Sequence, residues 1–222
     1  MLLLALDTST SAVTVAVHDG ERVLAERTTI DARRHAEVLA PSIRDAMAEA
    51  GRRPADLTAV AVGVGPGPFT GLRVGIATAA TLGLALDIPT YGVCSLDAIA
   101  HAAAVSHIGQ FVVATDARRK EVYWARYVAT SDGVQRLTDP GVCRPQDLAE
   151  EVRALPAAGR GPALYPDAFI ESVEPVDVSG ISLADFALGE LAAGRPLLPL
   201  QPLYLRQPDA KPAAARKSVL PR

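Results

Sequence analysis

The pattern of apolar and polar positions predicts three opening strands. Residues 2–6 are continuously apolar and end at Asp7, which is typical of a buried strand. Residues 11–28 alternate on either side of a turn at residues 18–20, which indicates two further strands. Because such short connections join neighbouring strands as hairpins, the three strands are expected to be antiparallel.

Helical spacing follows at residues 33–51. Apolar side chains share one face of this segment, at Leu39, Ile43, Ala46, Met47 and Ala50. Gly51 stands where a helix C-cap is expected, and Pro41 predicts a kink or a late start of the helix.

Strands and helices alternate in the next part of the chain. The pattern predicts a buried strand at 57–65, an apolar helix to about Leu86, a strand at 89–93 and a helix from about Ser95. Strands separated by helices usually run parallel, so the first half is expected to form a mixed sheet. That order is typical of ribonuclease H-like and actin-like α/β folds.

The second half repeats the order in a shorter form. Residues 110–116 form a strand that ends at Asp116, and 121–129 form its hairpin partner. A helix is expected at 145–155, whereas 157–169 are too irregular to repeat the long glycine-rich segment. We therefore predict a duplicated actin-like fold, with mixed sheets flanked by helices and a truncated second lobe. The expected divisions are a first lobe at 1–106, a smaller second lobe at 107–206 and a disordered tail at 207–222.

Composition narrows the possible partners and the compartment. The net charge of −3 gives no whole-molecule attraction to nucleic acid. Cys94 and Cys143 match no metal-binding spacing and are expected to be reduced thiols of a cytoplasmic protein. The longest stretch of low charge, at 74–86, is shorter than the roughly 18 to 20 residues that a membrane helix needs, so no membrane contact is expected.

The segment 63–75, GVGPGPFTGLRVG, permits two interpretations. It lacks the lysine of a P-loop and the glycine spacing of a dinucleotide site, although a helix N-terminus can attract an anion without a motif. Small residues also recur at every fourth position, at Gly67, Gly71, Gly75, Ala79 and Gly83. Glycine costs a helix about 1 kcal/mol relative to alanine, so this spacing favours a face that packs closely, inside the chain or against a partner.

The polar candidates are equally open to two interpretations. Asp7 and Asp116 end strands where they could hold a metal–phosphate group, but each could equally cap the turn that follows, which we favour. His35 is expected to pack or to face a partner. The mixture of basic and aromatic residues at 116–127 could bind RNA, although an alternating strand with one solvated face is the simpler interpretation.

Six segments together resemble the bacterial TsaB family, also called YeaZ. They are LALDTST, RRHAEVLAPSI, GVGPGPFTGLRVGIATAATLGLAL, GVCSLDAIA, DARRKEVYWARY and PLYLRQPDA. The resemblance implies an actin-like fold and a role in making N6-threonylcarbamoyladenosine beside the anticodon of tRNAs that read codons beginning with A. It also implies a non-catalytic subunit, without cofactor or metal, that pairs with the catalytic paralogue TsaD and the ATPase TsaE. Ser95 and Ile99 stand where TsaD carries its two metal-binding histidines.

The resemblance also directs attention to a partner surface. We expect the first helix and the glycine-rich helix to form it, and tRNA to be reached only through the complex. The same surface could make a homodimer when TsaD is missing. The expected interface residues are His35, Leu39, Ile43, Thr70, Gly71, Val74, Gly75, Thr78 and Ala79. The main alternative is a nucleotide-binding ATPase or kinase of the same fold, and a peptidase is a third possibility without a visible catalytic arrangement.

Overall fold

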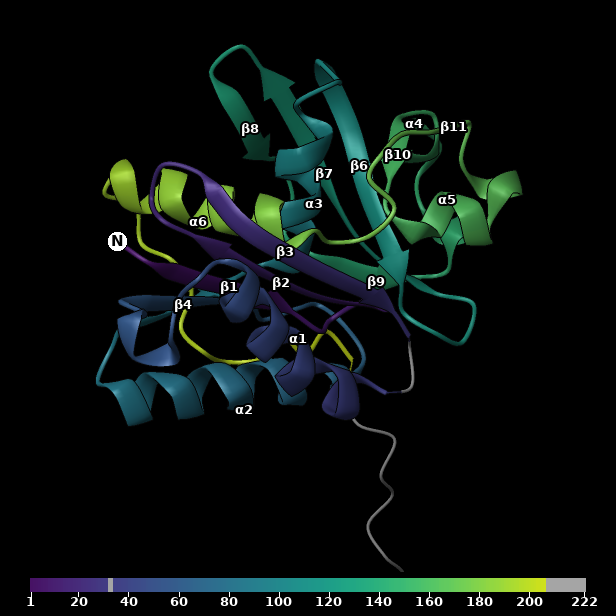
Figure 1. Cartoon of the computed structure of the whole chain (residues 1–222). Helices are drawn as coiled ribbons and strands as arrows, with labels where there is room; N and C mark the ends of the chain where they lie inside the picture. The colour runs from purple at the N-terminus through teal and green to yellow at the C-terminus, as the bar shows by residue number, and fades with distance from the viewer. Residues whose placement is uncertain (32–33, 207–222) are drawn as a thin grey trace, which may run out of the picture.

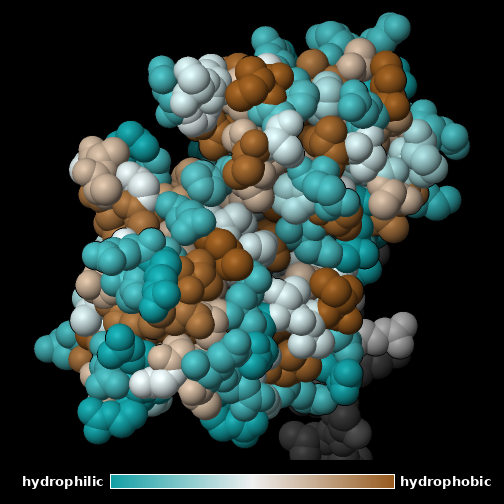
Figure 2. Space-filling model, turned by 45° about the horizontal axis from the view of Figure 1, so that its top comes forward, coloured by the Kyte–Doolittle hydropathy of each residue, from teal (hydrophilic) through white to brown (hydrophobic). Residues whose placement is uncertain are grey.

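Two mixed β-sheets form the framework of the molecule, with helices between them and on their outer faces (Figure 1). The computed structural model describes residues 1–31 and 34–206, so the predicted disordered tail at 207–222 lies outside it. On the face drawn in Figure 2, hydrophobic side chains reach the surface in separate patches among hydrophilic ones.

The first sheet has five strands in the order β3-β2-β1-β4-β5. The strands are β1 (Leu3–Asp7), β2 (Ala12–His18), β3 (Val23–Ile30), β4 (Ala59–Gly63) and β5 (Thr90–Val93). β1, β2 and β3 are antiparallel, whereas β4 pairs parallel with β1 and β5 parallel with β4. The expected mixed sheet is therefore confirmed.

The second sheet repeats this topology. Its strands are β6 (Gly109–Asp116), β7 (Val122–Thr130), β8 (Gly133–Arg136), β9 (Gly141–Cys143), β10 (Pro156–Ala158) and β11 (Glu171–Ser172). The order β8-β7-β6-β10-β11 matches β3-β2-β1-β4-β5, with an antiparallel β6–β7 pair and a parallel β6–β10 pair. The duplicated actin-like fold is thus confirmed.

The helices separate the sheets into layers. They are α1 (His35–Glu49), α2 (Phe69–Leu86), α3 (Ser95–Ala103), α4 (Glu150–Arg153), α5 (Arg160–Leu164) and α6 (Gly180–Ala192), with 3-10 turns at Pro54–Asp56, Pro145–Asp147 and Pro166–Ala168. α1 and α2 cover one face of the first sheet (Figure 1). α6 covers the opposite face and packs on α3, which contacts the second sheet.

The first helix confirms one expectation and corrects another. Gly51 has a φ of +63°, and the N–H groups of Gly51 and Arg52 donate to the carbonyls of Ala48 and Met47. This is the predicted glycine C-cap. The helix begins at His35 and contains Pro41, so of the two alternatives for Pro41 the late start was wrong and the kink stays a prediction.

α2 is longer than the apolar stretch seen in the sequence. Its 18 residues have a mean hydropathy of 1.4, and by length and composition alone such a helix could cross a membrane. A helix in the core of a globular protein can have the same length and composition. One face of α2 is buried against β4 and the loop after β1, so the two faces of this helix have to be considered separately.

The second lobe departs from the sequence analysis in two places. The helix expected at 145–155 is a 3-10 turn followed by the four-residue α4, because Leu148 and Ala149 between them have extended backbone. α6 was missed, although Ser179 caps it by accepting from the N–H of Ser182. The division into lobes at residue 106 stays a prediction, since α6 returns to pack on the first sheet.

Candidate functional site

The glycine face of α2 lies directly on the loop that follows β1. A Cβ atom at Gly67, in the turn just before α2, would overlap the carbonyl oxygen of Ser9, and one at Gly71 would overlap that of Thr8. At Gly75 it would lie 2.5 Å from Thr8 Oγ1, closer than any real Cβ contact. The sequence left open whether this stripe packs inside the chain or against a partner. In the structure it packs inside the chain.

Thr8 forms two hydrogen bonds across this contact. Its hydroxyl donates to the carbonyl of Gly71 at 2.7 Å and accepts from the N–H of Gly75 at 3.0 Å. The groups that face the glycines from the loop are therefore carbonyl and hydroxyl oxygens. Carbonyl oxygens repel a phosphate, whereas a phosphate cradle presents N–H groups. The glycine face is thus a packing surface rather than an anion site.

Asp7 lies at the centre of a buried polar cluster where β1 and β4 end. One carboxylate oxygen accepts from the N–H and hydroxyl of Ser9 at 2.7 and 2.8 Å. The other accepts from the Ser95 hydroxyl at 2.6 Å, and a Cβ at Gly63 would overlap it. Burial raises the pKa of Asp7 above 3.8, an effect that the hydrogen bonds from Ser95 and Ser9 partly offset. The carboxylate therefore holds the turn after β1, as the sequence analysis favoured.

The raised pKa leads to a prediction for Asp7→Asn. A group whose folded pKa is raised stabilises the fold fully below its unfolded value, near 3.8, and this contribution is lost as the pH rises through the folded pKa. We expect the free energy of unfolding of the wild type to fall relative to the variant as the pH rises from 4 toward neutrality. The fall should be about 1.4 kcal/mol for each pH unit that separates the folded pKa from the unfolded one. Urea unfolding at a series of pH values measures this. A difference that stays constant would show that folding does not raise the pKa.

Ser95 and Ile99 occupy the positions that the resemblance assigns to metal-binding histidines. Ile99 is fully buried in the apolar core between the sheets, and Ser95 is buried and bonded to Asp7. Neither side chain is available to a metal ion. Among the residues that the structure describes, no group of three or more His, Cys, Asp and Glu side chains could hold one.

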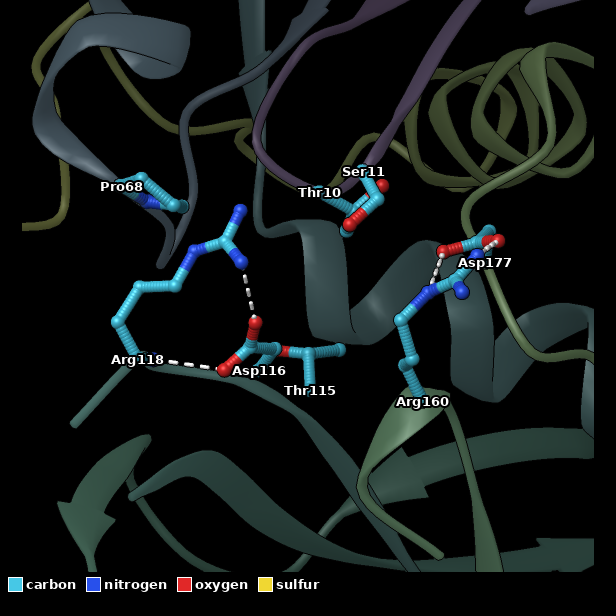
Figure 3. A pocket seen from close by; sticks show the side chains of 8 residues that line it. All are labelled: Thr10, Ser11, Pro68, Thr115, Asp116, Arg118, Arg160 and Asp177. Atoms are coloured by element: carbon cyan, nitrogen blue, oxygen red, sulfur yellow. Dashed lines mark hydrogen bonds and ion pairs between the residues drawn. The ribbon is translucent and has the colours of Figure 1, made fainter. Parts of the chain in front are cut away.

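A small hollow lies between the loop after β1, the end of β6 and the start of α5 (Figure 3). Its volume of about 10 Å³ suits one water molecule. Arg118 pairs with Asp116 at 3.0 Å, and Arg160 pairs with Asp177 on the other side. Each guanidinium is therefore already balanced by a carboxylate. Asp116 thus lies in an ion pair at the end of β6 and accepts from the N–H of Arg118 at 2.7 Å, which is the turn-capping role that we favoured.

The residues expected to form a partner interface are not equally accessible. Four are buried within the chain: Leu39, Gly71, Gly75 and Ala79. Their inclusion reflected the helical spacing, which cannot tell a face that packs on its own sheet from one that meets a partner. Ile43, Val74 and Thr78 are partly exposed, Thr70 is exposed, and His35 is half-buried with Nε2 2.9 Å from the carbonyl oxygen of Thr10.

Of the outward face of α2, sequence reasoning named only Thr70. Eight residues of this helix are exposed: Phe69, Thr70, Arg73, Ala77, Ala80, Thr81, Leu84 and Ala85. Only Arg73 among them is charged, and Leu84 is 87% exposed. The signal was present, because the sequence from Val74 to Leu86 lacks charge on every side of the helix. An exposed helix face normally carries charged and polar residues, so this one is a candidate interface.

Three comparisons with known proteins bear on identity. Residues 22–193 match the family model described as TsaD, tRNA N6-adenosine threonylcarbamoyltransferase. An uncharacterized protein of Mycobacterium tuberculosis is 48% identical and covers 96% of this chain and 95% of its own length. The tRNA threonylcarbamoyladenosine biosynthesis protein TsaB of Escherichia coli is 33% identical, over 78% of this chain and 77% of its own.

A solved structure agrees with these relatives. YeaZ from Pseudomonas aeruginosa superposes with a TM-score of 0.79 at 31% identity, over 92% of this chain and 99% of that one. Another solved structure from that organism, with a TM-score of 0.81, is described as similar to peptidase YEAZ. The similarity thus extends over both lobes in sequence and in fold. The chain belongs to the TsaB (YeaZ) family of tRNA threonylcarbamoyladenosine biosynthesis proteins.

Proposed function

We propose that this chain is a non-catalytic subunit that binds a TsaD paralogue and, with the ATPase TsaE, supports transfer of the threonylcarbamoyl group to tRNA. The observation that carries the proposal is the outward face of α2, on which Arg73 is the single charged residue. Residues 74–86 of this helix carry no charged side chain on any side, yet the chain covers only its glycine face. A helix of that kind is normally buried all round, so a partner is expected to cover the rest.

The chemistry of this surface suits another helical protein. Its exposed side chains are mostly Ala and Thr, which allow two helix backbones to approach closely. The family model names a threonylcarbamoyltransferase, which is the kind of paralogue that shares this fold. Two related folds can meet through the same elements, as in an isologous dimer. A homodimer through α2 is therefore the expected state when the paralogue is missing.

An ATPase or kinase is less well supported. Pockets that hold ligands of nucleotide size measure about 300 to 1,000 Å³, whereas the hollow in Figure 3 measures about 10 Å³. Its two arginines are each paired with an aspartate, so a phosphate would have to displace a carboxylate.

A peptidase is also less well supported. Ser95 donates directly to Asp7, without a histidine between them, and its side chain is buried. A serine nucleophile needs a neighbouring base and access to substrate.

The proposal is tested by mixing the purified chain with its TsaD paralogue. Size-exclusion chromatography with light scattering should give a 1:1 heterodimer in place of the homodimer. The chain alone should hydrolyse no more ATP than a buffer control, whether or not Mg²⁺ is added. ATP hydrolysis by the chain alone above that of the buffer control would support an ATPase instead. Failure to form any heterodimer would overturn the proposal.

A further inference from the structure

Three consecutive cationic residues occupy an unusual backbone conformation in the loop between β6 and β7. Arg118, Arg119 and Lys120 have φ values of +61°, +55° and +64°, the left-handed region that favours glycine. All three are exposed. Side chains other than glycine or asparagine are disfavoured there, and such outliers persist where the surrounding structure holds them and often mark functional segments. This loop projects positive charge at a cost in backbone strain.

The loop is held by the last described residues of the chain. Arg206 pairs with Glu121 and donates to the carbonyl of Ala117 at 3.1 Å. Nearby, Tyr204 stacks on Phe69 with ring centroids 5.3 Å apart. The guanidinium of Arg73 lies 4.2 Å from the centre of the Phe69 ring, which fixes its position at the surface.

A second set of residues continues this basic region on the other side of the loop. Lys120 and Arg144 line one open groove together with Tyr165, Gln146 and Asp147. The groove has a volume of about 530 Å³. We define the basic surface by the exposed cations Arg119, Lys120 and Arg144. Arg118 is not counted because it pairs with Asp116, and Arg73 is not counted because it lies on the outward face of α2.

The charge of this surface differs from that of the whole chain. The molecule carries a net −3, yet three exposed cations gather here; Glu121 pairs with Arg206, Asp116 pairs with Arg118, and Asp147 is the carboxylate among the residues that line the groove. Beyond Arg206 the chain continues into residues 207–222, which contain four basic side chains and one acidic one. The basic tail therefore starts where the basic surface lies.

We infer that this basic surface binds the phosphate backbone of tRNA. The inference rests on the proposed function, which supplies the RNA. Guanidinium groups pair with phosphate through two parallel hydrogen bonds, and backbone contacts of this kind position an RNA without reading its sequence. An acidic protein is the competing partner, but the open groove and the spread of cations over two segments fit a long polyanion better.

The test uses the double variant Lys120→Glu/Arg144→Glu in the full-length chain. Both substitutions lie away from the outward face of α2. The matched control is Arg22→Glu/Arg52→Glu, which changes the net charge equally at exposed positions of the first lobe. Fluorescence anisotropy with labelled, unmodified tRNA measures the affinity of the heterodimer, and of the chain alone at about 50 mM salt.

We expect the basic-surface variant to bind tRNA at least tenfold more weakly than the control. The slope of log Kd against log salt should fall by about 1.5, because two phosphate contacts are lost at about 0.7 to 0.9 each. Assembly with the paralogue should be unchanged. Equal affinities for the two variants, or a loss of paralogue binding in place of tRNA binding, would overturn the inference. If no heterodimer forms at all, the proposed function fails, and the chain alone still tests the surface.

Discussion

Gly75→Leu is expected to lower the free energy of unfolding of the isolated chain by about 1 to 3 kcal/mol, the usual cost of overpacking a core. A Cβ at this position meets Thr8 Oγ1 at 2.5 Å, Leu6 Cδ1 at 3.4 Å and Val62 Cγ2 at 3.5 Å. The helix propensity of leucine recovers less than about 1 kcal/mol. We expect the backbone to shift more at Thr8 than at Leu6 or Val62, because the Thr8 hydroxyl is hydrogen-bonded to both Gly71 and Gly75.

The matched control is Ala77→Leu on the exposed side of the same helix. It adds a similar side chain where the surface is open, so the free energy of unfolding should change by less than about 0.5 kcal/mol. Urea unfolding followed by circular dichroism compares the two variants. A Gly75→Leu chain as stable as the wild type that nevertheless fails to bind the paralogue would place the glycine face in the partner interface.

Ala77→Glu/Leu84→Glu is expected to weaken binding of the TsaD paralogue at least a hundredfold. Two carboxylates would be buried without partners in the proposed helix–helix contact, and each unpaired buried charge costs several kcal/mol even after the surrounding structure relaxes. Stability of the isolated chain should hardly change, because Ala77 is exposed and Leu84 is 87% exposed. Isothermal titration calorimetry with the purified paralogue measures the loss.

The control for this variant is Ala163→Glu/Leu164→Glu on α5. It exchanges the same two residue types at exposed positions of the second lobe. We expect wild-type affinity for the paralogue. An equal loss of affinity in both variants would indicate a general effect of negative charge, and retained binding by Ala77→Glu/Leu84→Glu would exclude the outward face of α2 from the contact.

The local pattern was sufficient to predict the first sheet. β1 to β3 are joined by short connections, and the continuous apolar run of β1 matches its complete burial. The alternation in β2 did not indicate its burial, because all seven of its residues are buried between α1 on one face of the sheet and α6 on the other. The strand that ends at Asp116 and its hairpin partner were predicted in the same way, from an apolar run followed by a short connection. The helix at 145–155 failed because Leu148 and Ala149 adopt extended backbone after a proline-led turn, which helical spacing alone does not reveal. α6 was overlooked although its serine cap is a local signal.

The candidate site was less accessible to sequence reasoning. Spacing identified the glycines of α2, but their role depends on the carbonyls of Thr8 and Ser9, which lie far earlier in the chain. The position of Ser95 indicated a lost metal ligand only through the family resemblance, and its bond to Asp7 is a long-range contact. The left-handed run from Arg118 to Lys120 is a backbone property with no signal in composition.

We propose that this chain supports threonylcarbamoyl transfer as a partner of a catalytic paralogue and does not perform it. The direct measurement is the amount of threonylcarbamoyladenosine in unmodified tRNA incubated with the threonylcarbamoyl adenylate, the paralogue and TsaE, quantified by mass spectrometry of nucleosides. We expect full modification with the wild-type chain, little with Ala77→Glu/Leu84→Glu, and none when the paralogue is omitted. Modification by this chain without the paralogue, or undiminished modification when this chain is left out, would show that the chain does not have this supporting role.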